Sequence, residues 1–141
     1  MKMKYKFLEH TADIMFEAYG KTLNELFENA ALATEETMIE LKEIKLKTLK
    51  EVEFKNDNVE KLLYDFLSEL IFLKDAELLL FSKIKVKIKL VKKIYELKAI
   101  LSGERLTNKH KQKVDVKAVT FHKFKIEKIN NNYLARVILD I

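Results

Sequence analysis

The 141-residue sequence lacks cysteine and proline altogether and is poor in glycine and arginine. Its only glycines are Gly20 and Gly103, and its only arginines are Arg105 and Arg136. Without cysteine the chain forms no disulfide, thiolate nucleophile or thiolate-ligated metal site. Two glycines provide neither a flexible linker nor a phosphate-cradling loop. Arginine guanidinium groups often make the bidentate hydrogen bonds that recognise bases. With only two arginines, sequence-specific DNA binding is not expected.

Composition indicates one domain. The chain is 48% hydrophobic and 35% charged, with a formal net charge of +5 that favours encounters with polyanions without identifying one. At this length there is apolar material for one core, so we expect a single domain over residues 1–141. No apolar run is long enough to span a bilayer, and the opening MKMKYKFLEH has no signal-peptide pattern. A cytoplasmic protein is therefore expected.

Two segments carry helical periodicity. In the first, Thr22 and Glu25 have the spacing of a capping box, and the apolar residues that follow recur on one helical face. In the second, Asp57 and Glu60 have the same spacing. This second helix has its apolar positions at i, i+3 and i+4 over three turns: Val59, Leu62, Leu63, Phe66, Leu67, Leu70 and Ile71.

The rest of the chain has a period of two, which is typical of strands. An opening strand ends near Tyr19, and another surrounds LKEVEF. A long hairpin turns at the KK of KLVKKIYELK, and the strands KFKIEKI and YLARVILDI are joined at INNNY. We therefore expect an α+β fold, a single-domain sandwich with two helices covering one face of a mostly antiparallel sheet.

The final strand brings two acidic groups to its end. Both faces of YLARVILDI are partly apolar, which predicts a strand interior to the sheet. Its end carries the Asp140 side chain and the α-carboxylate of Ile141. Two carboxylates held close repel each other unless a cation neutralises them, and hard cations such as calcium or magnesium prefer oxygen ligands. The alternative is a solvated carboxylate pair without a metal.

Another acidic residue, Asp13, opens an apolar strand beside His10 and Thr11. This cluster either caps the entry of the chain into the sheet or contributes ligands. Glu17 lies on the same strand face, where a solvated glutamate is an equal alternative. Zinc is not indicated, because the histidines lack HExxH spacing and cysteine is absent. His110, among lysines in NKHKQK, is expected to be exposed.

Alternating lysines follow one strand of the hairpin, at positions 83, 85, 87 and 89. Such a stripe could meet the phosphates of a nucleic acid or an acidic partner, but alternating lysine on a strand is usually its solvated face. We favour the solvated face.

Several motifs together resemble the archease family. They are EHTADI, YGKTLNELFENAALA, LLYDFLSELIFL, SGERL, VKAVTFH with KIEKI, and the closing LDI, in family order over essentially the whole chain. The sequence departs from the family pattern at Met15, where glycine is frequent, and at Phe121, where tyrosine is usual.

The resemblance implies a divalent-metal site, calcium in type, formed by Asp13, Asp140 and Ile141. It also implies a non-catalytic activator of the tRNA-splicing RNA ligase, which promotes guanylylation of the ligase by GTP and its multiple turnover in tRNA exon joining. The catalytic residues then belong to the ligase catalytic subunit, and contact with tRNA is expected to be indirect.

Two other function classes stay open at this point. One is a chaperone-like accessory to a tRNA-modifying enzyme such as a tRNA cytosine methyltransferase, a role also associated with the family. The other is a metal-dependent hydrolase, in which converging carboxylates activate water. No nucleophile or general base for that chemistry can be identified in the sequence.

Overall fold

The computed structural model describes residues 3–9 and 12–141. Within them it has seven strands, two α-helices and one 3₁₀-helix. The strands are Tyr5–Leu8 (β1), Ile14–Gly20 (β2), Thr48–Asn56 (β3), Leu79–Val91 (β4), Ile94–Arg105 (β5), Ala118–Ile129 (β6) and Asn132–Asp140 (β7). The helices are Leu23–Met38 (α1), Leu41–Glu43 (η1, 3₁₀) and Val59–Glu77 (α2). None of the helices in the described ranges is long and apolar enough to cross a membrane.

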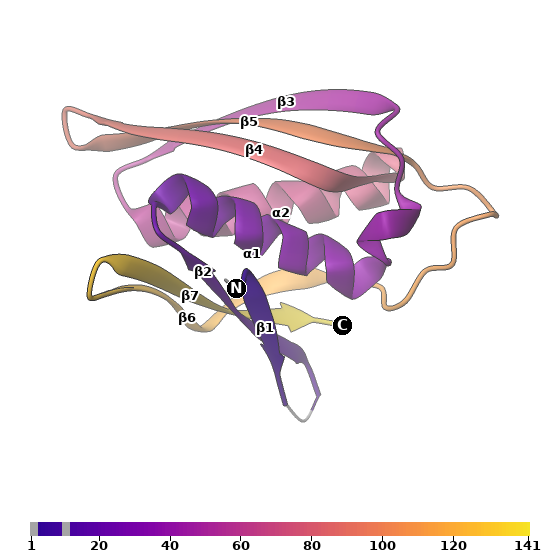
Figure 1. Ribbon diagram of the computed structural model, residues 1–141, viewed down its shortest axis with the longest axis horizontal. Helices are drawn as coiled ribbons and strands as arrows, with labels where there is room; N and C mark the ends of the chain where they lie inside the picture. The colour runs from indigo at the N-terminus through magenta and orange to yellow at the C-terminus, as the bar shows by residue number, and fades with distance from the viewer. Residues whose placement is uncertain (1–2, 10–11) are drawn as a thin grey trace.

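The helices lie between two antiparallel sheets (Figure 1). One sheet has the order β1-β2-β7-β6 and the other β3-β5-β4. α1 packs against β4 on one side and β2 on the other, and α2 packs against β3 and β6. The expected α+β class, with two helices on antiparallel sheet, is confirmed. The sequence led us to expect one sheet, whereas the helices have a sheet on each side, because both carry apolar residues around much of their circumference.

The four-stranded sheet places β7 in its interior, as the two partly apolar faces of that strand predicted. β7 pairs with β2 from Ile14↔Leu139 to Gly20↔Tyr133 and with β6 on its other side. Ala135, Val137 and Leu139 are fully buried on the face that meets the helices. The end of the chain is therefore held by backbone pairing on both sides.

The three-stranded sheet is built around the long β4–β5 hairpin. Its turn residues Lys92 and Lys93 have φ values of 51° and 69°, as a two-residue turn with both central residues in the left-handed region requires. Gly103 of β5 lies so close to β4 that a Cβ there would be 1.9 Å from the carbonyl oxygen of Leu80. Lys83, Lys85, Lys87 and Lys89 are exposed, which agrees with a solvated face.

Side chains of α1 accept hydrogen bonds from β4, the edge strand of that sheet. The backbone N–H groups of β4 residues Ile88, Val86 and Phe81 donate to Asn24 Oδ1, Glu28 Oε2 and Glu35 Oε1, at 2.8, 2.9 and 3.1 Å. These α1 side chains share one helical face. An edge strand otherwise presents unpaired donors, so α1 covers this edge.

The caps of the two helices differ in how well the sequence predicted them. α1 begins as expected, because the Thr22 hydroxyl accepts from the Glu25 N–H at 3.1 Å. At α2 the expected Asp57 cap is wrong: the N-cap is Asn58, whose side chain accepts from the Lys61 N–H at 3.0 Å. Glu60 accepts instead from the Ile126 N–H of β6 at 2.8 Å, which ties the start of α2 to the four-stranded sheet.

Glu35 is a carboxyl group inside the core. It is fully buried, and within the described residues its Oε2 has no hydrogen-bond partner. Burial raises the pKa of Glu35 to about 8, against smaller opposing effects of the Phe81 N–H and the Lys74 charge. The group is therefore mostly protonated in the folded protein at neutral pH.

Asn58→Ala should lower the free energy of unfolding by about 1 kcal/mol, because it removes the cap of α2. Asp57→Ala is the matched control and should cost only a few tenths of a kcal/mol, through the helix dipole. Urea denaturation of both variants checks this. Equal losses, or a larger one for Asp57→Ala, would contradict the assignment.

Glu35→Gln should make stability less dependent on pH. Between the ordinary carboxyl pKa of 4.5 and about 8, the unfolded chain loses the Glu35 proton while the folded protein keeps it, so wild-type stability falls as pH rises. The slope is roughly 1.4 kcal/mol per pH unit, and Glu35→Gln lacks it.

Denaturant titrations of the wild type and Glu35→Gln at pH 5.5 and 7.5 measure this difference. Their gap in unfolding free energy should shift by roughly 2–3 kcal/mol in favour of the variant as pH rises. Glu51→Gln, at an exposed position on β3, should follow the wild-type slope. Parallel curves for wild type and Glu35→Gln would show that Glu35 is ionised in the fold.

Candidate functional site

The β2–β7 register brings two of the predicted metal residues to one end of the sheet. Ile14 pairs with Leu139, so the residues one step further along, Asp13 and Asp140, lie at the same end of adjacent strands. Asp13 is half-buried, Asp140 is exposed, and Ile141 is 36% exposed. His10 and Thr11 lie outside the described residues. Backbone pairing thus brings together Ile14 and Leu139, which are 125 positions apart in the chain.

The backbone around Asp140 is fixed by the strand beside it. Asp140 pairs with Ala118 of β6, and its carbonyl accepts the Lys117 N–H at 2.8 Å. Its carboxylate makes no hydrogen bond or ion pair with any other residue that the structure describes. The strand pairing therefore holds the Asp140 main chain and leaves its side chain available.

The segment that contacts Asp140 is itself anchored to α2. The Lys74 ammonium, buried in the last turn of α2, donates to the Val116 carbonyl at 3.0 Å and forms ion pairs with Asp75 and Asp115. These carboxylates raise the pKa of Lys74 against the opposing effect of burial. Lys117 was not among the predicted site residues, because no local pattern shows that its N–H meets the Asp140 carbonyl.

The donor chemistry at this end suits a hard cation. Asp13 and Asp140 supply carboxylate oxygens, and Ile141 supplies main-chain oxygen, the ligand type that calcium prefers. Within the described ranges no group of three His, Asp or Glu side chains is arranged to hold a metal. The metal site at this end therefore stays a prediction.

Two other acidic residues have structural partners. Glu17 lies opposite Arg136 across the β2–β7 pair and accepts from its guanidinium at 2.7 Å. This hydrogen bond lowers the pKa of Glu17, against the opposing effect of burial. Glu17 thus forms a cross-strand ion pair with Arg136. It is neither a ligand beside Asp13 nor a freely solvated carboxylate.

Glu104 lies near the end of β5, in the other sheet. It accepts from the Lys45 N–H at 2.7 Å and pairs with His110 Nε2 at 3.0 Å. Both contacts lower the pKa of Glu104, and the hydrogen bond from the Lys45 N–H has the larger effect. The expectation that His110 is exposed is wrong: its side chain is only 9% exposed, because it packs against this carboxylate.

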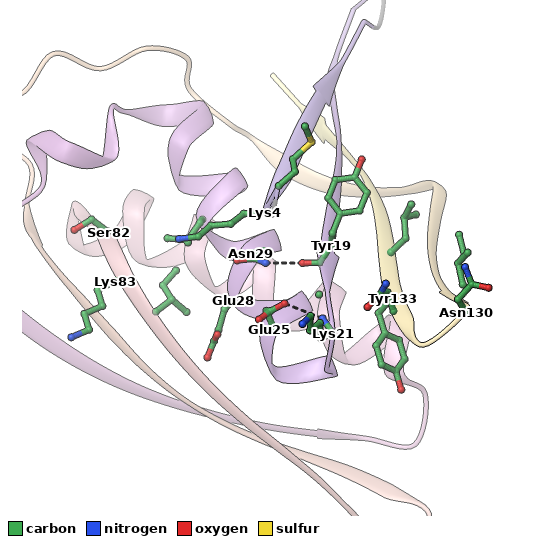
Figure 2. Close-up of a pocket in the computed structure, with 17 residues that line it drawn as sticks. Lys4, Tyr19, Lys21, Glu25, Glu28, Asn29, Ser82, Lys83, Asn130 and Tyr133 are labelled. Carbon is green, nitrogen blue, oxygen red and sulfur yellow. Dashed lines mark hydrogen bonds between the residues drawn. The ribbon is translucent and has the colours of Figure 1, made fainter. Parts of the chain in front are cut away.

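A cavity of about 800 Å³ lies at the opposite end of β2 and β7 (Figure 2). Gly20 and Tyr133, which pair there, both line it. Asn29, on α1, donates to the Tyr19 carbonyl at 2.6 Å within it, and Glu25 accepts the Lys21 N–H at 2.9 Å. Its charged lining mixes lysines with glutamates. The cavity and the Asp13–Asp140 end are separated by the length of β2.

Comparison with known proteins gives a consistent result. The model of the Archease protein family (MTH1598/TM1083) matches residues 5–141. Among similar proteins, the "Protein archease" of Thermococcus kodakarensis is 42% identical over 140 residues, covering 98% of this chain and 99% of the relative. The archease of Pyrococcus abyssi is 40% identical, with the same coverage.

Two solved structures have the same fold. The solution structure of Methanobacterium thermoautotrophicum protein 1598 superposes with a TM-score of 0.89 at 41% identity, over 98% of this chain and 99% of that one. The crystal structure of a Thermotoga maritima archease, described as a possible chaperone, gives a TM-score of 0.63 at 25% identity, over 100% and 99% of the two chains. With the family model, the relatives and the fold in agreement, this chain belongs to the archease family.

Proposed function

We propose that this archease activates the tRNA-splicing RNA ligase by promoting its guanylylation by GTP and its multiple turnover in tRNA exon joining. The observation that carries the proposal is the pairing of Ile14 with Leu139, which places Asp13 and Asp140 at one end of the molecule in a chain of this family. The activity is that of the partner, and this chain supplies an accessory surface. Because GTP and tRNA are cytoplasmic, we place the protein in the cytoplasm.

A divalent cation, calcium in type, is the proposed cofactor. Asp13, Asp140 and Ile141 would hold it through oxygen atoms. Two adjacent carboxylates are costly to desolvate at a protein interface unless their charge is neutralised. When bound, the cation would supply positive charge and free coordination positions for anionic oxygens of a partner or nucleotide.

The chain's own residues have a positioning role in this proposal. The β2–β7 pairing keeps Asp13 and Asp140 at one end, and the Lys117 N–H fixes the main chain of Asp140. The exposed Asp140 carboxylate is free to meet a partner surface. Pre-formed geometry of this type lowers the ordering cost of docking.

Calcium binding tests the cofactor directly. Asp140→Asn and Asp13→Asn should each weaken calcium binding, measured by isothermal titration calorimetry, by at least about tenfold, since even residues that only support a ligand usually contribute that much. Asp57→Asn, at an exposed position before α2, should leave the affinity unchanged. Equal calcium affinity in all four proteins would exclude this site.

Single-turnover guanylylation of the cognate ligase with GTP tests the activity. The wild-type chain should stimulate the reaction, and a truncation lacking Asp140 and Ile141 that keeps its far-ultraviolet circular dichroism and cooperative melting should not. Asp57→Asn should stimulate as the wild type does. Absence of stimulation by the wild type would overturn the proposal, and full stimulation by the folded truncation would remove the role of the acidic end.

A second candidate is a chaperone-like accessory to a tRNA-modifying enzyme such as a tRNA cytosine methyltransferase. It is favoured by the description of the Thermotoga maritima relative as a possible chaperone. Suppression of methyltransferase aggregation, measured by light scattering, without any effect on guanylylation would support this candidate over the first.

A further inference from the structure

Three aromatic side chains cluster where α2 meets β6: Tyr64, Phe121 and Phe124, which we call the aromatic platform. Tyr64 and Phe124 are partly buried against the core, and Phe121 is exposed. The rings of Tyr64 and Phe121 are stacked, with centroids 4.0 Å apart and planes 13° apart. The Phe124 ring is nearly perpendicular to both, with centroids 6.1 Å from Tyr64 and 5.8 Å from Phe121. Phe121 is 55% exposed, although a phenylalanine in a strand is usually buried.

These distances show where Phe124 lies relative to the stacked pair. Phe124 is almost equally far from the two stacked rings, so it lies beside the pair. A ring on the outer face of Phe121 would be much further from Tyr64 than from Phe121. The outer face of Phe121, away from Tyr64, is therefore not covered by either ring of the platform, consistent with the exposure of this side chain.

The backbone of β6 is irregular where it carries Phe121. Thr120 pairs with Ile138 and Lys125 with Arg136, so residues 121–124 of β6 stand opposite the single residue Val137 of β7. Lys123 has a φ of 54°, in the left-handed region that non-glycine residues seldom adopt. Such bulges re-aim side chains and are frequent next to functional sites. Here Phe121 lies in the bulge, stacked on Tyr64 of α2 on one side and exposed to solvent elsewhere.

The bulge also carries positive charge. Lys123 is exposed, as is Lys117 at the start of the same segment, and neither forms an ion pair with a described residue. Among the neighbouring carboxylates, Glu60 accepts the Ile126 N–H and Glu127 pairs with Lys125, whereas the exposed Asp140 carboxylate lies opposite Ala118 and forms no ion pair with a described residue. Two exposed lysines without an ion pair, in the same segment as an exposed ring, match the two requirements of single-stranded nucleic acid, a stacking surface and charge for phosphate.

We propose that the aromatic platform stacks an unpaired base of single-stranded RNA on the open face of Phe121, with Lys117 and Lys123 supplying charge for the adjacent phosphates. This rests on the proposed function, in which the partner's substrate is RNA, and it replaces the expectation that contact with tRNA is indirect. Since Asp140 pairs with Ala118, three residues before Phe121, the platform lies about 10 Å along the strand from the acidic end.

Two other occupants fit less well. A protein partner's anchor residues usually fill a packed pocket, whereas this platform offers one open ring face. A free nucleotide is usually enclosed on several sides, and Phe121 lines neither the cavity beside Gly20 and Tyr133 nor a smaller one beside Lys74 and Asp115. An RNA strand needs only one ring face per base.

The test is fluorescence anisotropy of a labelled single-stranded oligoadenylate of about 10 nucleotides at low salt, without the ligase. Phe121→Leu keeps an apolar side chain but removes the ring, and should weaken binding by about tenfold. Phe121→Tyr keeps the ring and should bind as the wild type does. The matched control is Phe72→Leu, because Phe72 is 56% exposed on α2 and has no ring partner in the described residues.

Three results of the anisotropy assay would each overturn the proposal. They are no RNA binding by the wild type, equal binding by Phe121→Leu and Phe72→Leu, and competition by GTP that shows Phe121 to serve a free nucleotide. A loss of ligase stimulation in Phe121→Leu with unchanged anisotropy would also overturn it, by assigning the platform to a protein contact. Because no ligase is present, failure of the activator proposal in the guanylylation assay is measured separately and leaves the RNA result intact.

Discussion

The arrangement of the molecule depends on hydrogen bonds from sheet edges to helix side chains. β4 and β6 are edge strands, and each donates backbone N–H groups to polar side chains of the helix layer, three to α1 and one to Glu60 of α2. These bonds satisfy edge donors that would otherwise pair with another chain. They also fix the helices against both sheets, since apolar packing alone has no direction. One bond of this set has a cost, because it requires the Glu35 carboxyl in the core.

The acidic end is positioned by the same architecture. β7 lies between β2 and β6, so Asp140 is constrained from both sides, by its pairing with Ala118 and by the β2 register that brings Asp13 alongside. The segment before β6 is anchored in turn by Lys74 of α2. α2, the segment before β6 and β7 thus form a continuous support. A substitution in that support should shift the position of Asp140 even where the substituted residue does not contact a ligand.

The sequence predicted the elements better than their partners. Periodicity located both helices and the β4–β5 hairpin, because burial on one face leaves a direct trace in the residue order. It did not predict two sheets, since a pattern shows which face is buried and not what covers it. Asn58 was missed as a cap because its neighbour Asp57 is equally suited by residue type. SGER does not alternate apolar and polar residues, yet Ser102–Arg105 completes β5 through long-range pairing with β3 and β4.

The site was predictable only in part. Asp13 and Asp140 were singled out by family resemblance and by acidic residues at strand ends, but their proximity depends on a register between distant segments that no local pattern encodes. The contact of Lys117 with Asp140, the burial of His110 and the open ring of Phe121 all arise from long-range packing. Residue type alone favours a buried phenylalanine and an exposed histidine among lysines, and the structure has the reverse.

The central position of β7 has a consequence for biosynthesis. β2 is made early and must wait for a partner 125 positions later, from Ile14 to Leu139. Until then a nascent chain presents β2 with one unpaired edge, and such long-range pairing is slow to form. A ribosome that stalls before β7 releases a product in which β2 and β6 have lost their shared neighbour. Incomplete chains should therefore be targets for aggregation and proteolysis, and the cell would hold either the whole protein or almost none of it.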